Sequence, residues 1–238
     1  MLILGRRPPR RFSSADSEPV SARRRAARKR SSLQSRGIAG KPFLFRLLDQ
    51  LADAGLDRVV LCAGHRADDV AATVGTAYRS LRVEYSEEKA PLGTGGALRF
   101  ALPLLRADPV LAMNGDSFCE VDFLSFRAAH AASGASATLV VREVEDPSRS
   151  GRVEFGEDGR IRRFVEKAPG NGRGWINAGV YLLGRAMLES IPERRAVSLE
   201  REIFPAWVGR GLCAFPTEGK FLDIGTPESY VAAQSFFP

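Results

Sequence analysis

The chain has 238 residues, of which 44% are apolar and 26% are charged, a composition that is typical of a globular protein and excludes a fully disordered or fibrous one. At about 150 residues per domain, this length predicts one large domain, alone or with an appendage. Charged residues interrupt every long apolar stretch, and none approaches the roughly 18 residues of a membrane span, so we expect no membrane partner.

The net charge of +7 comes from one end of the chain. Residues 1–36 hold eleven Lys or Arg against Asp16 and Glu18, whereas residues 37–238 hold 24 basic and 26 acidic residues. A nucleic-acid surface would need basic side chains along a folded face. We therefore rank nucleic acid below small molecules as a partner.

The N-terminal segment shows no apolar period after Leu4. Large apolar residues are sparse among its Arg, Ser, Ala and Pro residues, so it buries too little surface to offset its ordering entropy. We divide the chain into residues 1–36, expected to be disordered, and a domain of residues 37–238. A transit peptide and a nucleic-acid arm are the alternatives for the segment.

Cysteine and histidine provide few soft metal ligands. Cys62, Cys119 and Cys213 are odd in number and form no CxxC pair, which favours neither a disulfide framework nor a zinc site and fits a reducing cytoplasm. We expect His65 and His130 to be solvated, or to support a ligand, rather than to bind a metal.

From Gly40 onward, helical and strand patterns alternate. Pro42 suits the first turn of a helix, apolar residues follow at helical spacing to Leu51, and Gly55 is placed to end the helix. The run Arg58–Ala63 is typical of a strand buried on both faces. Further predicted elements are a helix over 67–78, a strand over 81–85, a helix over 94–105, a strand over 109–113, a helix over 123–132 and a strand over 137–144.

This alternation implies βαβ units, and hence an open, Rossmann-like α/β sheet with helices on both faces. The second half departs from it. Its patterns predict a hairpin of 152–155 with 161–166, strands over 175–183 and 212–215, and a terminal helix that opens at Thr226 and Pro227 and runs through 236. We expect a mixed sheet with a small antiparallel lobe.

Ligands of such sheets lie beyond the carboxyl ends of the strands, where four polar segments follow apolar runs. In the first, Gly93, Thr94, Gly95 and Gly96 open a helix, so that small residues admit a flat or anionic ligand and helix amides favour negative charge. In the second, Asp116 follows a buried strand and is placed to hold Mg²⁺. A tight turn with a Thr cap and an Asx turn are the respective alternatives.

The third segment pairs Glu166 and Lys167, at a strand end, with Asn177 and Gly179 downstream. Carboxylate and amide groups bind hydroxyls and an ammonium neutralises phosphate, so this set suits a ligand that carries both. The alternative is a cross-strand ion pair beside an Asn with satisfied hydrogen bonds.

The fourth segment places Asp223 inside an otherwise apolar strand. An unpaired buried carboxylate is costly, and a metal shared with Asp116 would remove that cost. A structural hydrogen bond to the turn at Thr226 is the alternative.

Seven blocks in order resemble the sugar-phosphate nucleotidyltransferase family, which makes nucleotide sugars from an NTP and a sugar 1-phosphate. They are GKPFL at 40–44, EYSEEKAPLGTGGAL at 84–98, NGDSF at 114–118, FVEK at 164–167, GWINAGVYLL at 174–183, SLEREIFP at 198–205 and FLDIGTPESY at 221–230. Their spacing looks most like D-glycero-D-manno-heptose 1-phosphate guanylyltransferases, with mannose 1-phosphate guanylyltransferases second.

The resemblance implies an enzyme of nucleotide-sugar and surface-polysaccharide synthesis that uses GTP and a heptose 1-phosphate. The sugar 1-phosphate oxygen attacks the α-phosphate and pyrophosphate leaves, so positioning and charge neutralisation carry catalysis. The implied contacts are the base with Gly93, Thr94, Gly95 and Gly96, Mg²⁺ with Asp116 and Asp223, and the sugar phosphate with Glu166, Lys167, Asn177 and Gly179. A mannose 1-phosphate substrate and a sugar-phosphate-binding pseudo-enzyme stay open, as does a homo-oligomer.

One part of the family pattern is missing. The family opens with a strand, a GGxGTR loop and a Lys-Pro pair that cradle the triphosphate, whereas Leu2–Leu4 here precedes Arg-rich sequence without such a loop. Lys41 belongs to a later helix-opening Lys-Pro, so no catalytic Arg or Lys is assigned. A GC-rich gene read out of frame up to about Ile38 would produce this pattern. Since losing one preorganised donor costs roughly 10²–10³ in rate, we expect this chain to turn over little or no GTP.

Overall fold

The computed structural model describes residues 2–4, 37–38, 40–64, 67–148, 150–166, 172–225 and 227–237. Within them, a 10-stranded mixed sheet runs in the order β11-β10-β12-β7-β1-β4-β6-β5, and β9 pairs with both β12 and β13. The strands are β1 (Leu2–Leu4), β4 (Arg58–Ala63), β5 (Ala77–Tyr78), β6 (Leu81–Glu87), β7 (Val110–Met113), β9 (Ala137–Val144), β10 (Gly151–Phe155), β11 (Ile161–Glu166), β12 (Gly174–Leu183) and β13 (Leu212–Thr217).

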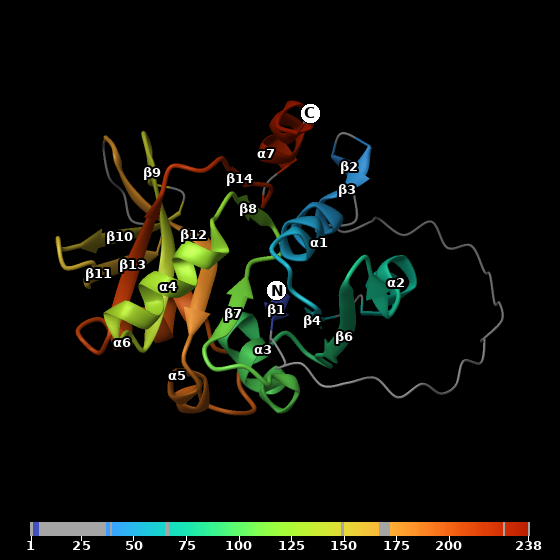
Figure 1. The fold of residues 1–238 in the computed structure, drawn as a ribbon, viewed down its shortest axis with the longest axis horizontal. Coiled ribbons are helices and arrows are strands. Elements are labelled where there is room, and N and C mark those ends of the chain that lie inside the picture. Colours follow the sequence, from blue (N-terminus) through green and yellow to red (C-terminus); the bar gives the residue numbers. More distant parts are fainter. Residues whose placement is uncertain are drawn as a thin grey trace.

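Two short strand pairs lie outside this sheet, β2 (Gly37–Ile38) with β3 (Lys41–Pro42) and β8 (Ser117–Cys119) with β14 (Phe221–Asp223). In Figure 1, α1 lies above the central strands and α3 and α5 lie below them. The helices are α1 (Phe43–Asp53), α2 (Ala67–Val74), α3 (Gly93–Ala101), α4 (Phe123–Ser133), α5 (Arg185–Ser190), α6 (Phe204–Trp207) and α7 (Pro227–Ala232), with shorter turns η2 (Leu102–Leu104), η3 (Leu199–Ile203) and η4 (Ala233–Ser235).

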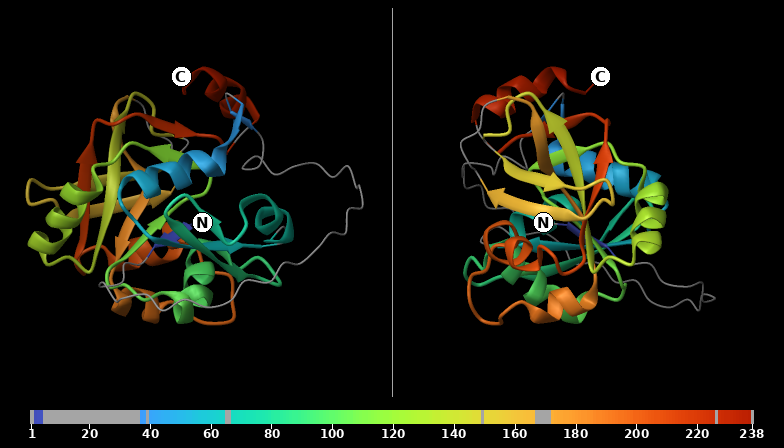
Figure 2. Two further views of the ribbon diagram at one scale, coloured as in Figure 1. Left: turned by 45° about the vertical axis from the view of Figure 1, so that its right-hand side comes forward. Right: turned by 90° about the vertical axis from the view of Figure 1, so that its left-hand side faces the viewer.

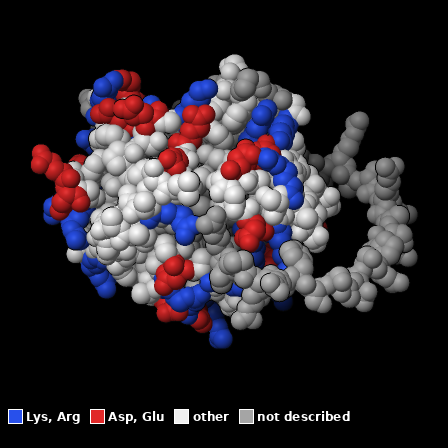
Figure 3. Space-filling view, in the orientation of Figure 1, with Lys and Arg blue, Asp and Glu red and all other residues white. Residues whose placement is uncertain are grey.

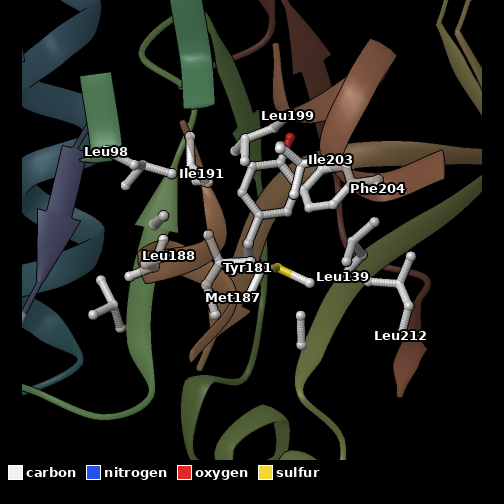
Figure 4. Packing of buried hydrophobic residues seen from close by; sticks show 14 of the residues in the cluster. Leu98, Leu139, Tyr181, Met187, Leu188, Ile191, Leu199, Ile203, Phe204 and Leu212 are labelled. Atoms are coloured by element: carbon white, nitrogen blue, oxygen red, sulfur yellow. The ribbon is translucent and has the colours of Figure 1, made fainter. Parts of the chain in front are cut away.

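The central strands are buried on both faces because successive residues enter two different cores. Val59 and Leu61 of β4 pack with α1 and α4, whereas Val60 between them packs with α3 and α5. Figure 4 shows the second core, where the ring of Tyr181 from β12 lies among side chains of α5, η3 and α6. The predicted open sheet with helices on both faces is therefore confirmed (Figure 2).

The short strand β1 is antiparallel to both of its neighbours, β4 and β7. Leu2 lies opposite Leu61 of β4 and Met113 of β7, and Leu4 lies opposite Val59 and Leu111. Strand β4 is parallel to β6. The C-terminal ends of β1 and β7 therefore lie on opposite sides of the sheet.

Most predicted elements are present, and the misplaced bounds have local causes. The helix predicted over 67–78 ends at Val74, because Gly75 adopts a positive φ of 74° and Ala77–Tyr78 pairs with β6 instead. The helix predicted over 94–105 ends at Ala101 and continues as the 3-10 turn η2, which contains Pro103. The sequence patterns did not reveal α5, η3, α6 or β8.

Two of the predicted segments fall partly or wholly outside the described residues. The Arg-rich segment of 1–36 is described only at β1, and Thr226 is not described. No helix in the described ranges is long and apolar enough to span a membrane. On the face drawn in Figure 3, basic and acidic side chains are interspersed over the described surface.

The first core depends on the buried stripe of α1. Leu47 is fully buried, whereas Leu124 at the start of α4 is 73% exposed. We predict that Leu47→Ala lowers the free energy of unfolding by about 2–5 kcal/mol, because it leaves a cavity between α1 and the sheet. Leu124→Ala is the matched control and should change it by less than about 0.5 kcal/mol. Urea denaturation of both variants measures the difference, and equal stability would contradict this packing.

Candidate active site

Two carboxylates meet where β7 and β14 end. The pairing of β14 with β8 places Asp223 opposite Ser117, the residue that follows Asp116. The amide of Ile224 donates to the Asp116 carbonyl oxygen at 2.8 Å, and the amide of Gly225 donates to Asp223 Oδ1 at 2.6 Å. A Cβ on Gly225 would lie 3.0 Å from Asp223 Oδ1 and 3.9 Å from Asp116 Oδ2, so both carboxylates border the same glycine.

The electrostatics of this pair are unfavourable in the absence of a cation. Burial raises the pKa of Asp116, and the negative charges of Asp223 and, more weakly, Glu200 raise it further. A neighbouring negative charge disfavours the ionised form of a carboxyl group. The expectation from the sequence that Asp116 and Asp223 converge therefore agrees with their positions, although Asp223 is exposed rather than buried.

A bulge in β12 forms a polar floor beside the pair. Gly179 has a positive φ of 77°, and its carbonyl oxygen accepts from the amide of Asn114 at 2.8 Å. A Cβ at this position would overlap the Ser117 hydroxyl. Among the described residues, Asn114 Oδ1 and Ser117 Oγ are buried without a hydrogen-bond partner. Ser117 was not predicted as a site residue, because a serine after Asp116 carries no chemical signal of its own.

The side chain of Asn177 is already engaged by its own strand. Its Nδ2 donates to the Tyr181 hydroxyl at 2.8 Å, and its Oδ1 accepts from the Gly179 amide at 3.0 Å. Tyr181 is fully buried, and burial raises the pKa of its phenol well above the ordinary value. Asn177 thus shapes the bulge, which corresponds to the alternative of an Asn with satisfied hydrogen bonds.

The glycines that open α3 make room for another part of the chain. The amides of Gly95 and Gly96 donate to the Val197 carbonyl oxygen at 2.9 and 3.2 Å, and a Cβ on Gly93 would lie 2.6 Å from that oxygen. These two amides already have a main-chain acceptor, so they are not available to an anionic ligand in this structure. Thr94 does not cap α3 either, because its hydroxyl donates to Glu200 Oε2 at 2.6 Å.

The remaining candidates have no described contact with the two carboxylates or lie outside the described residues. Glu166 ends β11 opposite Gly151, where a Cβ would lie 2.7 Å from Glu166 Oε2. Lys167 and His65 are not described. His130 is buried rather than solvated, its Nδ1 lies 2.8 Å from the Thr138 hydroxyl, and burial lowers its pKa, so it belongs to the core.

Two clefts of the described surface do not include either carboxylate. One, of ≈ 750 Å³, lies between α1 and the start of α4. The other, of ≈ 940 Å³, lies along the outer side of α3 and is bordered by Gly96 and Arg195.

The chain belongs to the nucleotidyl transferase family, whose sequence signature matches residues 34–238. It is 36% identical over 197 residues to the mannose-1-phosphate guanylyltransferase of Mycobacterium tuberculosis, covering 81% of this chain and 55% of that protein. It is 35% identical over 205 residues to the mannose-1-phosphate guanylyltransferase catalytic subunit beta of Drosophila pseudoobscura pseudoobscura, covering 84% of this chain and 55% of that protein. The chain thus spans about half the length of the curated relatives it matches.

A solved structure extends the comparison to the fold. HddC from Yersinia pseudotuberculosis, complexed with GMP-PN, superposes with a TM-score of 0.76 at 33% identity, covering 86% of this chain and 89% of that one. The family membership that the seven sequence blocks predicted is confirmed, and the matched range agrees with the resemblance beginning near Ile38.

The raised pKa of Asp116 predicts how the stability of the folded state changes with pH. Between the ordinary carboxyl pKa and the raised one, the folded state binds more protons than the unfolded state, so stability falls as pH rises. We predict that Asp116→Asn increases the free energy of unfolding at neutral pH and flattens its pH dependence in that window. Urea denaturation with a chelator, from about pH 4 to pH 7, measures this, and Glu157→Gln in an exposed turn is the control. An unchanged profile for Asp116→Asn would contradict the assignment.

Gly179 allows a second test of the site geometry. Gly179→Ala forces a left-handed alanine, which costs about 1–2 kcal/mol, and places a methyl group against the buried Ser117 hydroxyl. Gly134→Ala has a similar φ of 60° with nothing within 4 Å of the new Cβ. We expect Gly179→Ala to be clearly the more destabilised of the two in thermal unfolding, and equal losses would argue against the close approach.

Proposed function

We propose that residues 37–238 form a domain that transfers a guanylyl group from GTP to a sugar 1-phosphate. The sugar-phosphate oxygen forms a bond to the α-phosphorus, the bond from that phosphorus to the β-phosphate oxygen breaks, and pyrophosphate leaves. The single observation that carries this proposal is the convergence of the Asp116 and Asp223 carboxylates on Gly225, next to a floor of unpartnered polar groups.

Asp116 and Asp223 are the proposed Mg²⁺ ligands. The described residues contain no group of three or more His, Cys, Asp or Glu side chains suited to a metal. A pair of carboxylates nevertheless fits Mg²⁺, which commonly takes one or two carboxylates and completes its shell with water and phosphate oxygens. When bound, the ion supplies charge neutralisation on the phosphates.

The substrates have different kinds of support. Asn114 Oδ1 and Ser117 Oγ, both unpartnered within the described structure, suit a ligand rich in hydroxyl groups, which supports a sugar phosphate beside Gly179. Glu166 and Lys167 stay proposed contacts to the sugar phosphate, and Asn177 contributes by holding the bulge. Gly93, Thr94, Gly95 and Gly96 are proposed to meet the base, which the names of the relatives favour as guanine. Heptose and mannose 1-phosphate both fit this proposal.

The rate of this polypeptide is expected to be low. Residues 1–36 contain a single glycine, Gly5, and therefore no GGxGTR loop. Asp116 follows the C-terminal end of β7, and the C-terminal end of β1 lies on the opposite side of the sheet, because the two strands are antiparallel. A sugar-phosphate-binding protein without turnover is accordingly the second candidate function.

The test measures binding and turnover separately. We expect Mg²⁺-dependent GTP binding by calorimetry that Asp116→Asn and Asp223→Asn each abolish and Glu157→Gln preserves, since Glu157 is exposed and lies outside the site. Pyrophosphate release with GTP and mannose or heptose 1-phosphate should stay far below that of an intact relative. A rate within about tenfold of that relative would refute the expected loss of preorganised donors. Sugar-phosphate binding without metal-dependent GTP binding would favour the second candidate.

The surroundings of the enzyme are also proposed rather than established. All three cysteines are free thiols, and burial raises the pKa of Cys62 and Cys119 to about 12, which suits a reducing cytoplasm. The alternative of a nucleic-acid arm in residues 1–36 predicts steep salt dependence of binding, lost when the arm is deleted.

A further inference from the structure

The segment from Arg195 to Glu202 holds the start of α3 in place. The main chain of Val197 is hydrogen-bonded to the loop that leads into α3. Its carbonyl oxygen accepts from the amides of Gly95 and Gly96, and its amide donates to the Leu92 carbonyl oxygen at 2.8 Å. No side chain caps the N-terminus of α3. The conformation of this loop therefore depends on a segment about a hundred residues further along the chain.

One side chain completes this contact. Glu200 Oε2 accepts from the Thr94 hydroxyl at 2.6 Å and from the Ser198 hydroxyl at 2.8 Å. Thr94 Oγ1 in turn accepts from the Leu199 amide at 2.9 Å. Glu200 is thus the side chain that ties Thr94 to the segment.

The backbone around Glu200 is unusual and firmly anchored. It lies in η3, a single π-helical turn, a geometry that is rare and frequent at functional sites. Leu199 and Ile203 on either side of it are buried, and Figure 4 shows both against the ring of Tyr181. The turn therefore presents Glu200 from a rigid base.

The influence of Glu200 also reaches the candidate site. Its negative charge raises the pKa of both Asp116 and Tyr181, and no Lys or Arg of the described residues forms an ion pair with it. Its described side-chain partners are therefore the hydroxyl groups of Thr94 and Ser198, and the link to Thr94 is its contact with the α3 loop.

We propose that Glu200 is a positioning residue, which fixes Thr94 and through it the conformation in which the loop of residues 93–96 meets the guanine nucleotide. This inference rests on the proposed function. Glu200 itself need not touch the nucleotide. Its effect is on GTP affinity, and the affinity for the sugar phosphate should not depend on it.

The test compares variants that remove or keep the hydrogen bonds. Glu200→Ala and Thr94→Val should each weaken Mg²⁺-dependent GTP binding by about tenfold, the usual effect of a lost hydrogen bond to a charged group, and leave mannose 1-phosphate binding unchanged. The double variant should lose little more than either single one, because both remove one contact. Glu200→Gln and Thr94→Ser keep the acceptor and the hydroxyl and should bind GTP as the original chain does.

Glu202→Ala is the matched control. Glu202 lies on the same segment with the same charge, and it accepts from Ser198 and Arg195 without touching the α3 loop. Hydrogen exchange of the Gly95 and Gly96 amides, measured on the same proteins without ligand, reports the loop directly. It should be faster in Glu200→Ala and unchanged in Glu202→Ala.

The outcomes separate this inference from the function on which it rests. GTP affinity and amide exchange that are both unchanged in a folded Glu200→Ala protein overturn the positioning role. Additive losses in the double variant, or impairment of Glu200→Gln equal to that of Glu200→Ala, also overturn it, since charge would then matter rather than the link. If the original chain binds no GTP, the proposed function fails, and unchanged exchange in Glu200→Ala would then overturn the link to the loop as well.

Discussion

The pairing of β8 with β14 is the constraint on which the candidate site depends. It brings Asp223, from near the end of the chain, beside Asp116, which follows the central strand β7. Folding thereby holds two like charges together at a partly buried position, and part of the folding free energy is lost to their repulsion. In the proposed function, a cation held by this pair would offset their repulsion.

Close contact between two segments of the chain explains why glycine occupies two positions near the site. Gly179 lacks a Cβ because the Ser117 hydroxyl occupies that space, and Gly93 lacks one because the Val197 carbonyl does. Both glycines therefore let distant segments meet. The loop at α3 is in this sense built by residues 195–200, and its shape is a property of the tertiary structure.

The described domain and the N-terminal segment have different relations to the family. The domain carries the fold, the carboxylate pair and the polar floor, whereas residues 1–36 carry no glycine-rich loop. The direction of β1 agrees with this difference. Because β1 is antiparallel to β4 and β7, its C-terminal end lies on the side of the sheet away from Asp116. For this reason the proposed function treats ligand binding and turnover as properties to be measured separately.

The sequence alone determined the elements with strong periodicity and the residues at strand ends. The apolar stripe of α1, the run of β4 and the acidic residues after β7 and in β14 were all recognisable, because burial on one or two faces and isolated charge leave a signal in neighbouring residues. Tertiary structure decided the rest. The occupied amides of Gly95 and Gly96 and the position of Glu200 beside Thr94 depend on partners about a hundred residues away in the chain, and no local pattern records such a partner.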